Sequence, residues 1–292
     1  MRVSLARALG TCFGVRDAIE AALDESFRGN LTIVGQLVHN PQTVQELRDH
    51  GVQMVASLDD DIPTTNVMIT AHGAPASTKK ILEERGHVVF DASCPLVLKV
   101  HNRVARLVRD GFFPVVVGQR HHVEVRGIVG DLDEYEVVLG PEEIDCLEGR
   151  DKIGIVCQTT QQIETARAVV DAIQSRFPGA EVKFVDTICQ PTKDRQLAVR
   201  ELTEEVDLMI VVGGYNSSNT KKLLKVCHDK GLAAHHIEDA AELEPEWFDG
   251  KEHVGITAGT STPHKVIEAV RDRIHAIGAD RSSGSSHATT AG

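Results

Sequence analysis

Three cysteines of the chain have the residue type and the spacing for metal chemistry. Cys12, Cys94 and Cys189 each follow a short, mostly apolar run, and they are separated by 82 and 95 residues. We interpret the runs as buried parallel strands, whose carboxyl ends are where α/β folds place their chemistry. Three thiolates that met at one point would bind a soft metal or an iron–sulfur cluster. Spacing alone leaves open the alternative that these are ordinary buried cysteines.

Further polar side chains follow other apolar runs, at turns where strands are expected to lead into helices. Hydroxyls, amides and imidazoles at such turns are suited to binding phosphate oxygens, and the chain has no P-loop motif that would do so instead. Helix capping is the alternative role for the serines and the asparagine. The residues concerned are His39, His72, His122, Ser217, Ser218, Asn219 and Ser261.

Composition narrows the class of protein. The 292 residues are 41% hydrophobic and 25% charged, as in ordinary globular domains, and the formal net charge is −12. This acidity argues against general binding of nucleic acid or of anionic membranes. No secretory signal and no apolar stretch of about 18 residues is visible, which favours a cytoplasmic protein that does not cross a membrane. The six cysteines are therefore expected to be reduced thiols or metal ligands rather than disulfides.

Apolar runs alternate with segments of helical spacing along the chain, which predicts an α/β fold with mainly parallel sheets. Grouped by threes, the runs predict three similar lobes. We expect a first lobe at 13–94, a second at 95–188, a third at 189–279 together with 1–12, and a disordered tail at 280–292.

The third lobe is predicted to be discontinuous. It contains the apolar runs LMIVVGG and HVGIT but no run that leads to a cysteine of its own. The N-terminal run VSLARALGTC has this form, so we expect it to complete the third lobe.

Several motifs together resemble one enzyme family. GTCFGVRDAIE, TAHGAP, DASCPLVLKVH, HHVEVRG, DTICQPTKDRQ and GGYNSSNTKKL occur in family order from residue 3 to about residue 275. They resemble the 4-hydroxy-3-methylbut-2-enyl diphosphate reductases. The resemblance implies three α/β lobes arranged pseudo-threefold around a central 4Fe–4S cluster. It also implies that Cys12, Cys94 and Cys189 hold this cluster and leave one iron with an open position.

The resemblance further implies a reaction, a substrate and a proton donor. The family reduces (E)-4-hydroxy-3-methylbut-2-enyl diphosphate, an allylic diphosphate, to isopentenyl and dimethylallyl diphosphates, using two electrons and two protons. Glu124 is expected to donate protons, with Thr159 and His122 assisting, and a ferredoxin or flavodoxin is expected to supply electrons. The residues expected to bind the substrate are His39, His72, His122, Thr159, Ser217, Ser218, Asn219 and Ser261.

Two positions depart from the family pattern. Phe13 places a bulky ring next to the first proposed ligand, and Arg126 places a positive charge two residues from Glu124. We expect nearby anions to raise the pKa of Glu124. If the segment were an extended turn, however, Glu124 and Arg126 would point the same way, and Arg126 would lower that pKa. Cys146, Cys157 and Cys227 match no ligand position of the family.

Other functions remain compatible with the sequence. An open iron could act as a Lewis acid in a hydro-lyase, without net electron transfer. A divergent paralogue could act on another small diphosphate. A third possibility, a redox or oxygen sensor without catalysis, would have no use for a diphosphate-binding set of histidines, serines and an asparagine.

Overall fold

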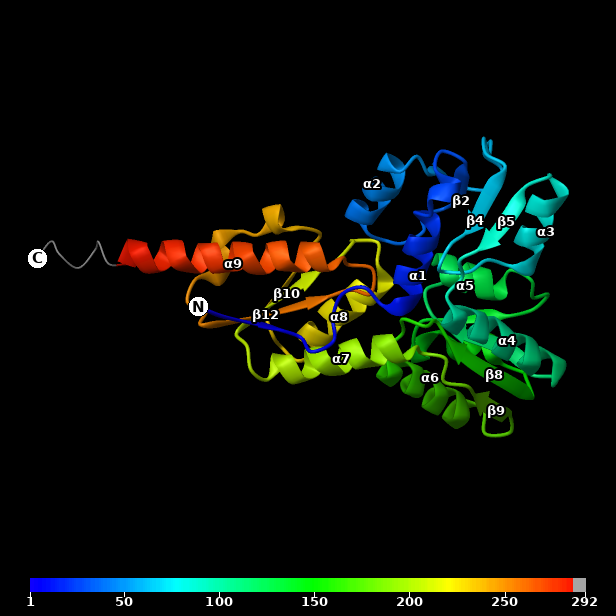
Figure 1. Cartoon of the computed structure of the whole chain (residues 1–292). Coiled ribbons are helices and arrows are strands. Elements are labelled where there is room, and N and C mark those ends of the chain that lie inside the picture. Colours follow the sequence, from blue (N-terminus) through cyan, green and yellow to red (C-terminus); the bar gives the residue numbers. More distant parts are fainter. Residues whose placement is uncertain (286–292) are drawn as a thin grey trace, which may run out of the picture. The chain divides into compact units, whose positions relative to one another are not determined.

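The fold is described from a computed structural model of the chain (Figure 1). The structure describes residues 1–285, with side chains described as far as Asp280. In this part of the chain three four-stranded sheets are present, and every pair of neighbouring strands runs parallel. The predicted α/β class with three parallel-sheet lobes is therefore confirmed. None of the described helices is both long and apolar enough to span a bilayer.

All three sheets share one strand order. In the first two sheets, the first strand in the chain lies inside, with the second on one side of it and the third and fourth on the other. The third sheet has the same order when its N-terminal strand is counted as the fourth. The first sheet is β3 (Gln53–Val55), β2 (Leu31–Val34), β4 (Asn66–Ile69) and β5 (Val88–Asp91). The second is β7 (Glu136–Val138), β6 (Phe113–Val117), β8 (Lys152–Cys157) and β9 (Glu181–Phe184). The third is β11 (Ala234–Ile237), β10 (Leu208–Val212), β12 (His253–Ala258) and β1 (Arg2–Leu5).

The N-terminal strand completes the third sheet, as the sequence predicts. β1 pairs with β12 in register from Arg2 opposite His253 to Leu5 opposite Ile256. It takes the fourth position, which β5 and β9 hold in the other two sheets. The three lobes therefore share the same strand order as well as similar apolar runs.

Helices cover the sheets. The first lobe has α1 (Phe13–Ala22), α2 (Pro41–Asp49) and α3 (Ala76–Glu84), and the second has α4 (Pro95–Arg109), α5 (Val123–Val129) and α6 (Ile163–Arg176). The third has α7 (Gln190–Thr203), α8 (Ser218–Asp229) and α9 (His264–Ser285). Short 3₁₀ helices span Glu25–Phe27, Pro141–Leu147, Ala240–Glu242 and Pro245–Phe248.

The third sheet shows how the cores form. Leu208, Ile210 and Val212 of β10 pack in the cluster that includes the apolar residues of α9. Met209 and Val211, which alternate with them, pack in the cluster that includes α7 and α8. Because successive side chains of a strand point to opposite faces, a strand covered by helices on both sides must be apolar throughout. Figure 1 shows α9 on one side of β10 and β12 and α7 on the other.

The chain divides into two compact units. The terminal unit comprises Met1–Cys12, His39–Pro41 and the described residues from Asp194 onward, and the central unit comprises Phe13–Val38 and Gln42–Lys193. The terminal unit holds the third sheet, and the central unit holds the first two. The predicted lobe boundaries and the pseudo-threefold arrangement stay predictions.

The C-terminal end differs from expectation. The sequence predicts disorder from residue 280, but α9 continues to Ser285. Adding a residue to an existing helix forms one hydrogen bond without a new nucleation cost, so small polar residues can prolong it. The rest of the predicted tail, 286–292, lies outside the described residues.

Candidate functional site

Each of the three cysteines directly precedes a helix. Cys12 precedes α1, Cys94 is the N-cap residue of α4, and Cys189 precedes α7. The strands β1, β5 and β9 end 7, 3 and 5 residues before these cysteines, so the expectation that each thiol ends a strand is wrong. A short turn follows each edge strand and delivers the thiol to a helix N-terminus. The unpaired N–H groups and the dipole of the helix favour negative charge there, which suits thiolates.

The cysteines are distributed over both units. Cys12 belongs to the terminal unit, and Cys94 and Cys189 belong to the central unit. Within the described residues no group of three His, Cys, Asp or Glu side chains has the spacing of a metal site. The convergence of the three thiols therefore stays a prediction.

In the central unit, Cys94 lies beside the histidine turn of the first lobe. Its N–H donates to the carbonyl of Ala71 at 3.0 Å, which ties Cys94 to the residue before His72. Gly14, in the first turn of α1, lies directly against the Cys94 sulfur, and any side chain at position 14 would collide with it. Glycine is therefore required there to give the thiol its space.

His72 and His122 face each other across the first and second lobes. Their ring centroids are 5.7 Å apart and the ring planes are inclined by 78°. His72 follows β4, and His122 is the N-cap residue of α5, so both lie at the strand-to-helix turns that the sequence predicts. The Nδ1 atom of His122 accepts a hydrogen bond from the N–H of Glu124 at 3.1 Å. Nδ1 is then unprotonated, which leaves Nε2 to carry a proton.

Glu124 is buried against Thr159. Its side chain is 2% exposed. Oε1 accepts from the N–H of Thr159 at 2.6 Å, and Oε2 accepts from the Thr159 hydroxyl at 2.8 Å. Burial raises the pKa of Glu124 to about 7, although the two hydrogen bonds from Thr159 oppose the shift. The predicted direction is confirmed, and in this structure its cause is desolvation.

Arg126 does not share the environment of Glu124. The segment forms α5, a helix, rather than an extended turn. Residues two positions apart on a helix do not face each other, and here Glu124 is buried while Arg126 is exposed. The condition for the two side chains to point the same way, an extended turn, is therefore not met.

Thr159 connects Glu124 to Cys189. The N–H of Cys189 donates to the carbonyl of Thr159 at 3.0 Å, and the Cys189 sulfur lies 3.1 Å from the Thr192 hydroxyl oxygen. A series of hydrogen bonds and one ring contact thus runs from Cys94, by way of Ala71 and its chain neighbour His72, through His122, Glu124 and Thr159 to Cys189. It joins six of the candidate residues within the central unit.

The terminal unit gathers the remaining candidate residues. The N–H of Cys12 donates to the carbonyl of Thr260 at 3.0 Å, and the hydroxyl of the next residue, Ser261, donates to the carbonyl of His39 at 3.2 Å. Gly214 lies so close to the His39 carbonyl that a side chain at position 214 would overlap it. His39 therefore rests against the loop that leads into α8.

The start of α8 contains buried polar side chains. Ser217, its N-cap residue, accepts from the N–H of Thr220 at 3.3 Å, so the predicted capping role is present. Asn219 is 2% exposed, and neither its Nδ2 nor its Oδ1 has a hydrogen-bond partner within the described residues. A buried amide without partners is costly, and a phosphate oxygen could accept from Nδ2. Burial, and secondarily the charge of Lys221, lowers the pKa of His39.

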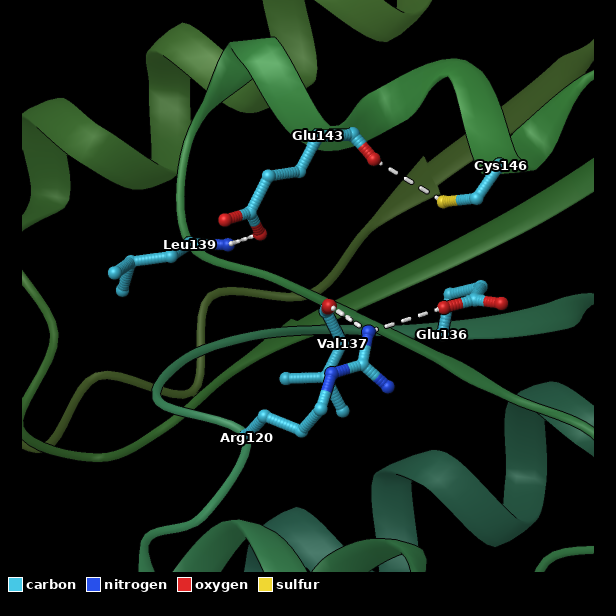
Figure 2. A network of polar contacts seen from close by, with 6 residues as sticks. All are labelled: Arg120, Glu136, Val137, Leu139, Glu143 and Cys146. Atoms are coloured by element: carbon cyan, nitrogen blue, oxygen red, sulfur yellow. Dashed lines mark hydrogen bonds and ion pairs between the residues drawn. The ribbon is translucent and has the colours of Figure 1, made fainter.

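The other three cysteines lack these features. Cys157 and Cys227 are buried in apolar clusters, and burial raises the pKa of both thiols, in Cys227 to about 12. Cys146 is exposed in the 3₁₀ helix Pro141–Leu147, where its sulfur donates to the carbonyl of Glu143 (Figure 2). The same small network includes Leu139, whose N–H donates to the Glu143 carboxylate. These thiols lie at no helix N-terminus.

Two residues that shape the site were not predicted from the sequence. Gly14 makes room for the Cys94 sulfur. Arg195, only 7% exposed, donates from Nε and Nη2 to the carbonyl of Gly10 and so holds the segment that leads to Cys12. The glycine next to GTCF was a visible signal, because a glycine inside a helical segment suggests a close approach. Nothing in the sequence pairs Arg195 with Gly10.

Comparisons with known proteins agree over nearly the whole chain. The model of the LytB protein family matches residues 3–275. The 4-hydroxy-3-methylbut-2-enyl diphosphate reductase of Geobacter sulfurreducens is 41% identical over 276 residues, which cover 94% of this chain and 97% of the relative. The reductase of the same name from Aquifex aeolicus is 40% identical over 282 residues, covering 94% and 96%.

Solved structures are similar as well. The structure of the E-1-hydroxy-2-methyl-but-2-enyl-4-diphosphate reductase from Plasmodium falciparum superposes with a TM-score of 0.85 at 26% identity, covering 91% of this chain and 86% of that one. A structure of (E)-4-hydroxy-3-methyl-but-2-enyl diphosphate reductase, described as the terminal enzyme of the non-mevalonate pathway, has a TM-score of 0.67 at 39% identity. It covers 94% of this chain and 99% of that one.

Proposed function

The chain belongs to the LytB protein family, and from that premise we propose that it reduces (E)-4-hydroxy-3-methylbut-2-enyl diphosphate. Two electrons and two protons enter, the carbon–oxygen bond of the allylic alcohol breaks, water leaves, and isopentenyl or dimethylallyl diphosphate forms. The observation that carries this proposal is the buried Glu124–Thr159 pair, whose carboxyl has a pKa of about 7 beside two histidines.

The family is one of iron–sulfur proteins, and we assign the cluster to three thiols. Cys12, Cys94 and Cys189 would hold a 4Fe–4S cluster with one open iron. The assignment is supported by the place of each thiol before a helix and by the space that Gly14 leaves at the Cys94 sulfur. When bound, the cluster supplies electrons one at a time and a Lewis-acidic iron.

The diphosphate would be bound by histidines, hydroxyls and an amide. Imidazole N–H groups, hydroxyls and an amide can each donate to phosphate oxygens, and the α8 N-terminus adds a favourable dipole. Asn219 supports this role, because its buried amide has no partner among the described residues. The proposed set is His39, His72, His122, Ser217, Ser218, Asn219 and Ser261.

Glu124 would deliver protons to the reacting end of the substrate. A carboxyl with a pKa of about 7 is partly protonated at neutral pH, which a general acid requires. The Thr159 hydroxyl, which donates to Glu124 at 2.8 Å, can pass a proton between the carboxyl and the substrate. His122 would assist, because its Nδ1 accepts a hydrogen bond from the Glu124 N–H.

Electrons would come from another protein. A ferredoxin or flavodoxin is the proposed donor, since the sequence has no flavin or nicotinamide motif. The sequence-based expectations of a cytoplasmic protein that binds neither nucleic acid nor membranes stay predictions.

The direct test is anaerobic purification, followed by iron counting and an assay with the allylic diphosphate. With a strong chemical reductant we expect iron in the protein and formation of both products. Conversion of the allylic diphosphate to a hydrated or dehydrated compound without any reductant would identify a hydro-lyase instead. Iron without binding of the diphosphate would favour a sensor, and absence of iron would disprove the cluster.

A further inference from the structure

A cavity of about 580 Å³ lies in the central unit at the carboxyl ends of the first lobe's strands. Val34 ends β2, Ile69 ends β4, and Ser57 follows β3, and all three line it. The strand order reverses at β2, because β3 lies on one side of it and β4 on the other. Open α/β sheets bind ligands at such switch points, and ligand cavities are commonly 300–1,000 Å³ in volume.

This cavity is separate from the candidate site. None of the cysteines, histidines or acidic residues assigned above lines it. Its second wall comes from α5, through Val123, Arg126 and Val129. The two walls meet where Gly127 of α5 packs against the loop after His72, since a Cβ at position 127 would be in ordinary van der Waals contact with the Gly73 carbonyl oxygen, at 3.4 Å.

The walls of the cavity are chemically mixed. Apolar side chains line it on several sides, and they include Val34, Met68, Ile69, Leu82 and Val129. Hydroxyl groups come from Ser57, Thr70, Thr78 and Tyr135. This combination of apolar surface with a few polar groups is typical of sites for small organic molecules.

Among the described residues that line the cavity, Arg126 supplies the one cation and Asp59 the one acid. Within the described residues the Arg126 guanidinium has no hydrogen bond or ion pair, and the Tyr135 hydroxyl has no hydrogen-bond partner. A guanidinium presents a planar fork that matches a carboxylate or a phosphate. One cation, opposed by one acid, suits a ligand with a single anionic group better than the two linked phosphates of a diphosphate.

We propose that this cavity is a second ligand site, for a small organic anion with one carboxylate or phosphate monoester group and an apolar body. The anionic group pairs with Arg126 and hydrogen-bonds to Tyr135. The apolar body lies against Met68, Ile69 and Leu82. The ligand differs in charge from the proposed substrate, and the cavity that binds it is lined by Gly73 but not by His72.

Calorimetric titration of the anaerobically purified holoprotein with phenyl phosphate tests the proposal. The titration is repeated with inorganic phosphate, which has the charge without the apolar body. We expect saturable binding of phenyl phosphate at one site and at least tenfold weaker binding of inorganic phosphate. Absence of saturable binding at about 10 mM phenyl phosphate would overturn the proposal.

Three variants locate the binding. Arg126→Gln removes the cation and should weaken phenyl phosphate about tenfold or more, as expected for loss of a charge-assisted pair. Thr78→Phe fills the cavity and should abolish binding. Arg109→Gln removes an exposed arginine of α4 outside the lining and should change nothing. Wild-type affinity in both Arg126→Gln and Thr78→Phe would overturn the assignment.

A fourth variant separates this site from the proposed diphosphate site. Asn219→Ala alters the start of α8 and should leave the affinity for phenyl phosphate unchanged. If Asn219→Ala weakened the binding while Arg126→Gln did not, the phenyl phosphate would be occupying the diphosphate site, and the second site would be disproved. No step of this test depends on turnover.

Discussion

At the scale of single residues, Glu124 is set apart by its burial. A carboxyl that is 2% exposed resists ionisation, so its pKa rises to about 7, although two hydrogen bonds from Thr159 oppose the shift. The raised pKa makes the stability of the folded chain depend on pH. Folded and unfolded chains differ in proton binding between the ordinary pKa near 4.5 and about 7, and the folded chain holds the proton more tightly. The contribution of Glu124 to stability is therefore full below pH 4.5 and is lost as pH rises through 7.

Replacing Glu124 by Gln should lower kcat by about 10² to 10⁴, the usual contribution of a general acid, without loss of iron. In the wild type, kcat/KM should fall as pH rises through about 7, because the protonated carboxyl is the active form. Steady-state kinetics from pH 5.5 to 9 under anaerobic conditions, with iron counting, measures both.

Glu84→Gln is the matched control for that substitution. Glu84 is exposed and forms an ion pair with Lys80, so this variant should keep wild-type kinetics at every pH. Near-normal turnover of Glu124→Gln would reject the proposed proton donor.

At the scale of elements, the recurring feature is an edge strand followed by a turn, a cysteine and a helix. β1, β5 and β9 occupy the same edge position in their sheets, and α1, α4 and α7 begin directly after the cysteines. The repeat places three thiols at three helix N-termini. One of these helices, α1, also makes room for another of the thiols, because Gly14 accommodates the sulfur of Cys94.

Gly14→Ala should reduce the iron content of the anaerobically purified protein several-fold. A methyl group at position 14 would displace the Cys94 sulfur, although alanine favours the helix itself by about 1 kcal/mol over glycine. Iron per chain and far-UV circular dichroism measure the two effects separately.

Glu20→Ala serves as the control, because Glu20 lies exposed on the same helix. This variant should keep its iron. Wild-type iron content in Gly14→Ala would contradict the assignment of Cys94 as a ligand that needs this space.

At the scale of the whole molecule, the third lobe is assembled from both ends of the chain. β1 pairs with β12, and partly buried Val3 packs in the same cluster as the apolar residues of α9. Arg195 adds a second tie by bonding to Gly10. The N-terminal segment therefore contributes to the core of the terminal unit as well as leading to Cys12.

Val3→Asp should lower the free energy of unfolding by about 1–3 kcal/mol, because it places an unpaired charge in a partly buried position of the sheet. Chemical denaturation of the anaerobic protein measures the change. Leu5→Asp, in the same strand at a side chain that is 40% exposed, should cost clearly less. Equal effects of the two substitutions would argue against a structural role for β1 in the core.

Much of this protein could be predicted from its sequence. The alternation of apolar runs and helical segments predicted the α/β class. The third lobe has no apolar run that leads to a cysteine, and this predicted that the N-terminal run completes the third sheet. Both depend on local patterns of burial, which residue order records directly. The motifs around Cys12, Cys94 and Cys189, taken together with HHVEVRG and GGYNSSNTKKL, also indicated the family.

Only the tertiary structure decided how these residues are positioned. Whether Glu124 and Arg126 share a face depended on α5 being a helix, and seven residues of HHVEVRG are too few for periodicity to decide this. The thiols proved to precede helices rather than to end strands. The pKa of Glu124, the space beside Gly14 and the cavity at Arg126 arise from contacts between segments distant in sequence, because burial is a property of packing and not of residue order.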